Sequence, residues 1–170
     1  MPTLAFSACF LPAPLKHICT NDMIVTTQVK LYKKVKFLFR CHAWDAVIEL
    51  CSDYLGRHWK SSDSTEFTNK NLFQREMHLL LARANYYKGE YPNAAKELNL
   101  YVMLYPKDVL GYYYLARTHY QLQNHDKTLY YIDNSLALDP NNPKFLLRKA
   151  LFLSRHNSRE ALNTIEEVVA

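Results

Sequence analysis

Glycine is scarce in this chain, with only 3 among 170 residues, beside 7 prolines. Because tight hairpins between strands depend on glycine-rich turns, a sheet with many short hairpins is disfavoured. No apolar run reaches the ~18 residues that a membrane-spanning helix needs. A hydrophobic fraction of 49% is too high for a disordered chain. We therefore expect a folded, mainly helical protein that does not associate with a membrane.

Cysteine is also sparse, and no two cysteines form a CxxC pair. All four lie in the first third of the chain: Cys9, Cys19, Cys41 and Cys51. A disulfide framework would cross-link the regular part of the chain, so we interpret these residues as reduced thiols of a cytoplasmic or nuclear protein. We expect no metal site, because no zinc module has the spacing of Cys41, His42, Cys51 and His58.

Signatures of catalysis and of nucleic-acid binding are missing too. The sequence has no nucleophile elbow, phosphate-binding loop or close carboxylate pair, so we expect neither an enzyme nor a cofactor. The net charge of +5 favours an acidic protein or peptide as the partner and does not require nucleic acid. The basic run at residues 30–40 would suit nucleic acid or phosphoinositide, but no glycine loop or aromatic cluster accompanies its lysines. A solvated helix face is the favoured interpretation.

Residues 1–22 differ from the rest and are predicted to be a disordered leader. Their apolar stretch, residues 4–11, is short, has no basic residue before it and is followed by Pro12 and Pro14. A secretory signal is the less favoured alternative, because it needs a charged start and a longer apolar run. Met23 is an alternative start of the chain.

Two amphipathic runs predict a degenerate helical hairpin over residues 23–56. The apolar stripe of its first helix, residues 25–39, consists of Val29, Tyr32, Val35, Leu38 and Phe39. That of its second helix, residues 44–55, consists of Trp44, Val47, Ile48, Cys51 and Leu55. The serine-rich stretch that follows has no periodicity, so residues 57–74 are predicted to form a polar loop or linker.

From residue 75 onward the chain repeats itself. Three alanines stand 34 residues apart: Ala82, Ala116 and Ala150. The same step relates Leu81 to Leu115, Arg83 to Arg117, Tyr86 to Tyr120, Leu98 to Ile132, Leu104 to Leu138 and Pro106 to Pro140. Such a period, with two helical runs closed by a proline, predicts helix-pair units at 75–108 and 109–142 and a truncated unit at 143–170.

Turn residues delimit these helices. Gly89 ends the first helix of the first unit, Pro92 falls in the first turn of the next helix, and Asn142 with Pro143 starts the third unit. A last helix is predicted at residues 159–169. We expect its apolar residues to be covered by further repeats or by a second copy in a homodimer, with a frayed monomeric end as the alternative.

Small side chains mark the predicted helix contacts, where bulk would push the helices apart. They are Ala82, Ala94, Ala116, Thr128, Ala150 and Ala161. Larger apolar residues are expected to fill the space between the helices: Leu81, Leu98, Leu104, Leu115, Ile132 and Leu138.

The pattern resembles the tetratricopeptide repeat at its leucine, alanine and proline positions: Leu81, Ala82, Ala94, Pro106, Leu115, Ala116 and Pro140. Thr128 and Lys149 depart from it, where alanine and leucine are usual. The resemblance covers residues 75–170 strongly and 25–55 weakly. It implies an all-α, right-handed superhelical solenoid of antiparallel helix pairs that acts as a protein–protein interaction scaffold or adaptor in a multiprotein complex.

The resemblance also implies that the first helix of each pair lines a concave groove. The inward-facing set is then Leu79, Arg83, Tyr86, Tyr87, Tyr113, Arg117, Tyr120, Lys144, Leu147, Arg148 and Leu151. Arginine and tyrosine are enriched at binding hot spots, so we predict a basic, tyrosine-rich groove for a partner subunit or acidic peptide. Its partner-binding residues are Arg83, Tyr86, Tyr87, Tyr113, Arg117, Tyr120, Lys144 and Arg148. Packing between helices is the alternative for some of the tyrosines.

Two narrower roles stay open. Co-chaperones of Hsp70 and Hsp90 in this family hold a C-terminal carboxylate in a clamp, whose third-repeat positions Lys144 and Arg148 match. Leu79, Arg83 and Tyr114 stand where the clamp has lysine or asparagine. The order of hairpin, loop and repeats also resembles the tetratricopeptide subunits of the anaphase-promoting complex.

Overall fold

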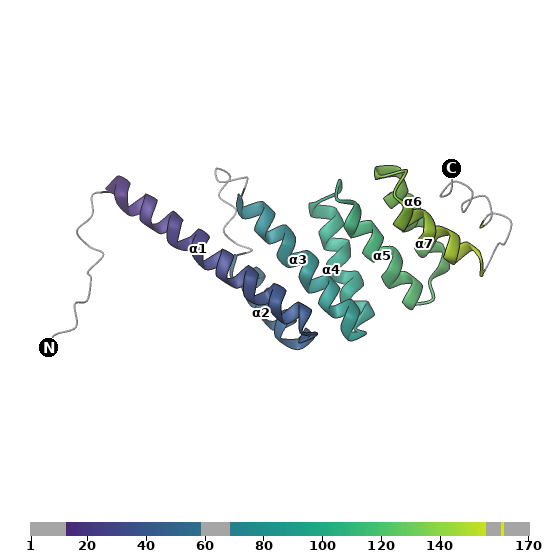
Figure 1. Cartoon of the computed structure of the whole chain (residues 1–170), viewed down its shortest axis with the longest axis horizontal. Coiled ribbons are helices and arrows are strands. Elements are labelled where there is room, and N and C mark those ends of the chain that lie inside the picture. The colour runs from purple at the N-terminus through teal and green to yellow at the C-terminus, as the bar shows by residue number, and fades with distance from the viewer. Residues whose placement is uncertain (1–12, 59–68, 156–160, 162–170) are drawn as a thin grey trace.

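A computed structural model describes residues 13–58, 69–155 and 161 of the 170-residue chain (Figure 1). The described part contains seven helices and no strand, which confirms the prediction of an all-α fold. The helices are α1 (Ala13–Arg40), α2 (Trp44–His58), α3 (Asn69–Lys88), α4 (Tyr91–Leu104), α5 (Val109–Gln121), α6 (His125–Leu138) and α7 (Pro143–Leu153).

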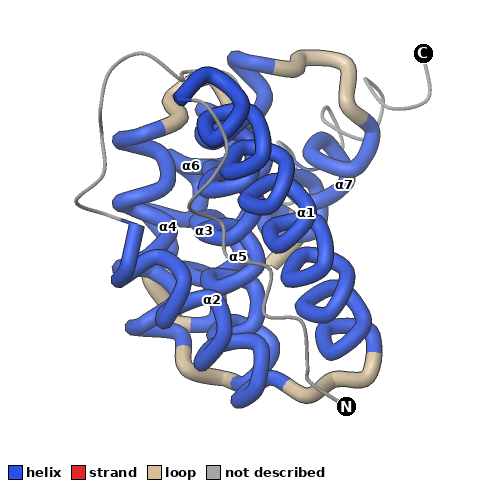
Figure 2. The backbone as a smooth tube through the Cα atoms, turned by 90° about the vertical axis from the view of Figure 1, so that its left-hand side faces the viewer, coloured by secondary structure: helices blue, strands red, loops and turns tan. Residues whose placement is uncertain are grey.

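The helices follow one another along the long axis of the molecule, and the view at right angles shows them stacked in depth (Figures 1 and 2). Each helix packs against the next one in the chain, and α3 also contacts α1 and α5. A stack in which elements contact only near neighbours is a solenoid. In this all-α solenoid the first helices of successive pairs adjoin one another.

Local signals set the helix ends as the sequence predicts. Gly89 follows α3 with a φ of 92°, and Pro92 lies in the first turn of α4. Asn142 caps α7, because its side-chain oxygen accepts a hydrogen bond from a backbone N–H at 3.1 Å. Asp108 and Asn124 cap α5 and α6 in the same way.

The small residues lie at the helix contacts, as predicted. Ala82, Ala116 and Ala150 are at most 1% exposed, and Ala94, Thr128 and Ala161 are buried as well. Thr128 replaces alanine without leaving a polar atom unsatisfied, because its hydroxyl donates to the carbonyl of Asn124 at 2.7 Å. The 34-residue period therefore corresponds to a repeated close approach of helices.

The larger apolar residues bear out the prediction in part. Leu81, Leu98, Leu115 and Ile132 are buried between helices. The prediction is wrong for Leu104 and Leu138, which are 43% and 42% exposed. Each is the last residue of its helix, so its side chain lies at the edge of the stack.

The predicted boundaries need correction before the first repeat. Helix α1 begins at Ala13, so the disordered leader is wrong for residues 13–22. Pro14 does not prevent this helix, because it lies in the first turn, where its missing N–H removes no intrahelical bond. Residues 1–12 lie outside the described part.

The predicted loop at 57–74 is wrong at both ends, because α2 runs through His58 and α3 starts at Asn69. The helical stretch before residue 75 places further side chains of α3 against the hairpin. Residues 59–68 lie outside the described part, as does the predicted helix 159–169 apart from Ala161.

The hairpin α1–α2 packs onto α3 through its own core. Val35, Val47, Cys51 and Met77 are fully buried there. Val29, the first residue of the predicted stripe, is instead 46% exposed. This core holds the degenerate hairpin at the start of the stack.

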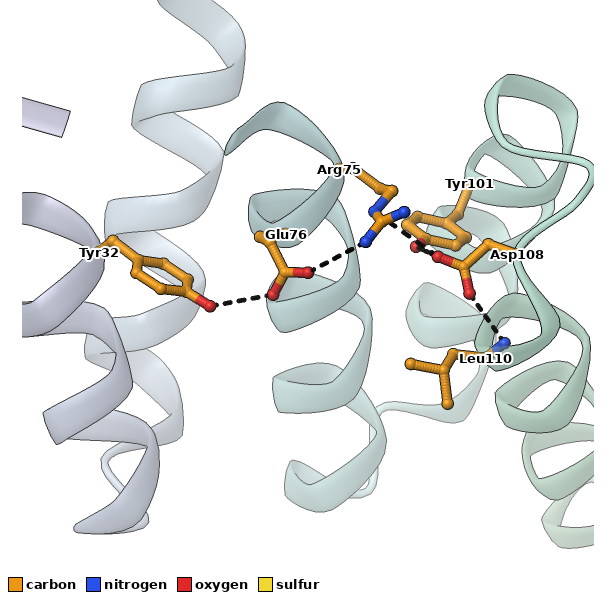
Figure 3. Close-up of polar contacts among 6 residues, drawn as sticks. All are labelled: Tyr32, Arg75, Glu76, Tyr101, Asp108 and Leu110. Carbon is orange, nitrogen blue, oxygen red and sulfur yellow. Dashed lines mark hydrogen bonds and ion pairs between the residues drawn. The ribbon is translucent and has the colours of Figure 1, made fainter. Parts of the chain in front are cut away.

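A polar network also ties successive layers together (Figure 3). The hydroxyl of Tyr32 on α1 donates to Glu76 on α3 at 3.1 Å. Arg75, next to Glu76, lies 3.6 Å from that carboxylate and 3.6 Å from Asp108 at the start of α5. Tyr101 on α4 donates to the same aspartate. These contacts link four helices, α1, α3, α4 and α5.

Candidate partner-binding surface

The repeat places two arginines at the same level of neighbouring helices, Arg83 on α3 and Arg117 on α5. Around them lie aromatic rings from the end of α1, the start of α2, α3 and α5. We call this set the arginine–tyrosine surface: Phe39, Trp44, Arg83, Tyr86, Tyr87, Tyr113, Tyr114 and Arg117.

Arg117 is surrounded by four tyrosines. Its guanidinium carbon lies 4.7 Å from the ring centroid of Tyr86, 5.5 Å from Tyr114, 5.7 Å from Tyr113 and 5.9 Å from Tyr87. These distances are those of cation–π contacts. Within the described residues, no carboxylate forms an ion pair with this arginine.

The charge of Arg117 is reflected in the pKa values around it. Burial lowers the pKa of Arg117, but the hydroxyls of Tyr86, Tyr87 and Tyr113 outweigh this effect and raise it above the ordinary arginine value. Burial raises the pKa of Tyr87, but hydrogen bonding and charge from Arg117 lower it overall. Burial raises the pKa of Tyr114 to about 12. The cation is thus stabilised by phenol groups without being neutralised.

Arg83 is held between rings in a similar way. Its guanidinium carbon lies 4.8 Å from the ring centroid of Phe39 and 5.2 Å from that of Tyr114. Its Nε is buried and has no hydrogen-bond partner in the described part of the chain. Tyr87 stacks on Trp44 at 5.4 Å, which joins the hairpin to this surface.

The other predicted site residues have different surroundings. Tyr86 is only 9% exposed, so little of its side chain is available to contact a partner directly. Tyr113 is half-buried against Phe145 of α7, at 5.1 Å between ring centroids. Tyr120 lies under Arg155, whose guanidinium donates to the tyrosine hydroxyl.

The remaining predicted groove residues divide between surface and core. Lys144, Leu147, Arg148 and Leu151 are exposed on α7. The prediction is wrong for Leu79, which is 4% exposed. It packs against residues of α4 and α5, since both helices cover that side of α3.

A cavity of about 420 Å³ adjoins this surface on the side of α7. Its arginines are Arg117, Arg148 and Arg155, and its walls include Tyr86 and Tyr120. The structure therefore brings Arg117 and Arg148 to one cavity. Lys144 does not line it.

Sequence reasoning missed three residues of this region. Phe39 and Trp44 were assigned only to the apolar stripe of the hairpin, yet their rings contact Arg83 and Tyr87. Arg155 follows α7 and is not among the residues predicted to line the groove. The signal for the first two is their position at the turn between α1 and α2, at the end of the hairpin that faces α3.

The described residues also limit other kinds of site. No group of three histidine, cysteine or acidic residues in that part of the chain is placed to hold a metal ion. Over the same residues, no helix combines the length and apolar character of a membrane span.

Comparisons with known proteins identify the fold. No protein-family model matches the chain, and no curated protein matches it significantly. Two crystal structures of MamA superpose on it with TM-scores of 0.68 and 0.67 at 17% identity, covering 84% and 87% of this chain and 76% and 74% of theirs. The MamA RS-1 ArsTM double mutant is similar, with a TM-score of 0.68 at 15% identity over 84% of this chain and 73% of that one. This likeness shows that the chain has the fold of an all-helical repeat protein.

Proposed function

We propose that the chain is a tetratricopeptide-type scaffold whose arginine–tyrosine surface binds an acidic segment of a partner protein. The observation that carries the proposal is Arg117, enclosed by four tyrosines and without a carboxylate partner among the described residues. A carboxylate of the partner would supply the missing counter-charge.

Energetics favour this ligand chemistry. A hydrogen bond to a charged group contributes about 1.5–3 kcal/mol, and guanidinium–carboxylate pairs form two such bonds in parallel. The rings around Arg83 and Arg117 restrict both side chains before binding, so less conformational entropy is lost on complex formation. Two such contacts support micromolar affinity, about −8 kcal/mol.

The 34-residue repeat and the MamA-like fold support assignment to the tetratricopeptide class. Scaffolds of this class work inside multiprotein complexes. We propose that this chain does the same in the cytoplasm or nucleus and that it has no catalytic activity of its own. The carboxylate clamp of the co-chaperones is not part of the proposal, because Leu79 and Tyr114, at two of its positions, are buried. No structural feature favours the anaphase-promoting complex over other assemblies.

The test is capture of partners from a cell lysate by the purified chain, followed by mass spectrometry and anisotropy titrations with labelled acidic segments of the captured proteins. Replacing both Arg83 and Arg117 by glutamate should weaken binding of such a segment at least tenfold. The matched control changes Lys96 and Lys107 to glutamate, because both are exposed and the net charge changes equally. Equal loss in both variants would show non-specific charge attraction and refute the proposal.

A further inference from the structure

A second cavity, of about 580 Å³, lies where the turn between α1 and α2 meets α3. Three cationic side chains line it, Lys36, Arg40 and Arg83. Its aromatic lining includes Phe39, Trp44 and Tyr87. The hairpin and the first repeat form this cavity together, so neither contains it alone.

None of the three cations that line this cavity forms an ion pair with a carboxylate among the described residues. Lys36 contacts only the ring of Tyr32, with its Nζ 4.6 Å from the centroid, among the interactions of the described residues. Neither Arg40 nor Arg83 forms an ion pair in that part of the chain, and the Nε of Arg83 is buried without a hydrogen-bond partner. A nearby cation outside the cavity, Lys88, is by contrast paired with Asp45 at 2.8 Å.

The aromatic rings on one side of the cavity pack against one another. Trp44 is stacked between His42 and Tyr87, with ring centroids 5.1 and 5.4 Å away and interplanar angles of 18° and 20°. His42 has a φ of 59°, a left-handed conformation that is unfavourable for a residue other than glycine. The turn is held by the hydrogen bond from the N–H of Ala43 to the carbonyl of Leu38 at 3.0 Å. The turn and the stacking therefore hold these rings in place on one side of the cavity.

We propose that this cavity binds a phosphorylated side chain of the partner polypeptide. A carboxylate carries one negative charge, whereas a phosphate monoester carries nearly two and offers three acceptor oxygens. Three unpaired cations around one cavity match the phosphate better. The proposal rests on the proposed function, since it places a phosphorylated residue within the acidic segment.

A peptide is favoured over a lipid headgroup because the cavity continues into the arginine–tyrosine surface. Arg83 lines the cavity and contacts Tyr114 on α5, and Tyr87 lines it and lies beside Arg117. An extended segment therefore contacts both sites, with its phosphate near α1 and its carboxylates near α5.

The experiment follows the fluorescence of Trp44, which lines the cavity. The chain has two tryptophans, so Trp59→Phe leaves Trp44 as the only one. Three blocked glycine pentapeptides, with phosphoserine, glutamate or serine at the centre, are titrated at constant ionic strength. We expect the phosphoserine peptide to change the fluorescence at a concentration at least tenfold lower than the glutamate peptide. No preference for phosphoserine would overturn the proposal.

Variants locate the effect. Lys36→Gln and Arg40→Gln should each weaken the phosphoserine response severalfold. Arg57→Gln, which removes only an exposed pair with Asp53 on α2, should leave it unchanged. Equal responses in all three variants would place phosphate binding elsewhere and overturn the proposal. The chain is also titrated with vesicles that contain phosphatidylinositol bisphosphate. If it binds these vesicles more tightly than the phosphoserine peptide, and Arg40→Gln abolishes the vesicle binding, the ligand is a membrane and the proposal is overturned.

The two proposals fail separately. Lys36 and Arg40 do not contact Arg117, so their variants test the cavity without disturbing the centre of the arginine–tyrosine surface. A missing phosphate preference leaves capture of an unphosphorylated acidic segment intact. If the parent chain captures no acidic segment, the response of Trp44 to the phosphoserine pentapeptide can still be measured on that chain.

Discussion

The hydroxyl of Tyr101 donates a hydrogen bond to the carboxylate of Asp108 over 2.5 Å. The other carboxylate oxygen of Asp108 accepts from the backbone N–H of Leu110 at 3.0 Å and so caps α5. Burial, and then the carboxylate, raise the pKa of Tyr101 far above its ordinary value, so the hydroxyl remains a donor throughout the physiological range. One aspartate thus fixes α5 against α4.

Replacing Asp108 by alanine should destabilise the fold by about 2–4 kcal/mol. The substitution removes the cap of α5, which contributes about 1 kcal/mol to stability. It also leaves the buried Tyr101 hydroxyl without a hydrogen-bond acceptor, which costs about 1–3 kcal/mol. Urea denaturation followed by circular dichroism measures the change. Asp108→Asn keeps a capping oxygen and should cost clearly less. Equal losses in the two variants would contradict the role assigned to the cap.

Gly111 marks a close approach between α4 and α5. A Cβ at this position would lie 2.7 Å from Cγ1 of Val102 and 2.8 Å from Cδ1 of Tyr101. Gly111→Ala should therefore destabilise the chain by about 1–3 kcal/mol through overpacking. Gly56→Ala is the matched control, because no atom lies within 4 Å of its Cβ position and alanine stabilises a helix by about 0.5–1 kcal/mol. Thermal unfolding should move in opposite directions for the two variants.

His119 makes stability depend on pH. It is 7% exposed, stacks on Tyr131 at 5.4 Å, and neither ring nitrogen has a hydrogen-bond partner in the described part of the chain. Burial, aided by the charge of Lys127, lowers its pKa below the ordinary value of 6.5. The unfolded state therefore takes up the proton first as the pH falls. This contribution to stability is complete above pH 6.5 and is lost as the pH falls towards the folded-state pKa.

His119→Phe keeps an aromatic ring and removes the two unsatisfied nitrogens. We expect the variant to be about 1 kcal/mol more stable than the parent at pH 7, with a larger advantage at pH 5. Urea denaturation at a series of pH values checks this expectation. A stability difference that stays constant with pH would show that the imidazole does not titrate as described.

Cys51 should be chemically inert in the folded protein. It is fully buried beside the sulfur of Met77, at 3.7 Å, and burial raises the pKa of its thiol to about 12. Because the thiolate is the reactive form, a variant that retains Cys51 alone should react with a thiol reagent at pH 8 only as fast as it unfolds. A variant that retains only the exposed Cys41 should react at once. Rapid labelling of Cys51 without denaturant would contradict its placement in the core.

Parts of the candidate site were predictable from the sequence. The repeat places Arg83 and Arg117 on neighbouring helices, since a fixed step in sequence becomes a fixed step in space. The contact of Phe39 with Arg83 was not predictable, because the hairpin has no consensus residues to set its register on α3. Leu79 was assigned to the groove from its spacing along α3, and its burial depends on how α4 and α5 cover that helix.

The sequence by itself determined the helical class, the 34-residue repeat, most helix ends and the small residues at helix contacts. These features are local or recur at a fixed interval, so neighbouring residues are enough to specify them. Only the tertiary structure decided which cations remain unpaired and where they meet in cavities. Lys88 finds its partner Asp45 and Lys149 its partner Asp133 across different helices, while Arg83 and Arg117 meet aromatic rings. Such pairing depends on residues brought together from distant parts of the chain, and no pattern within one repeat specifies it.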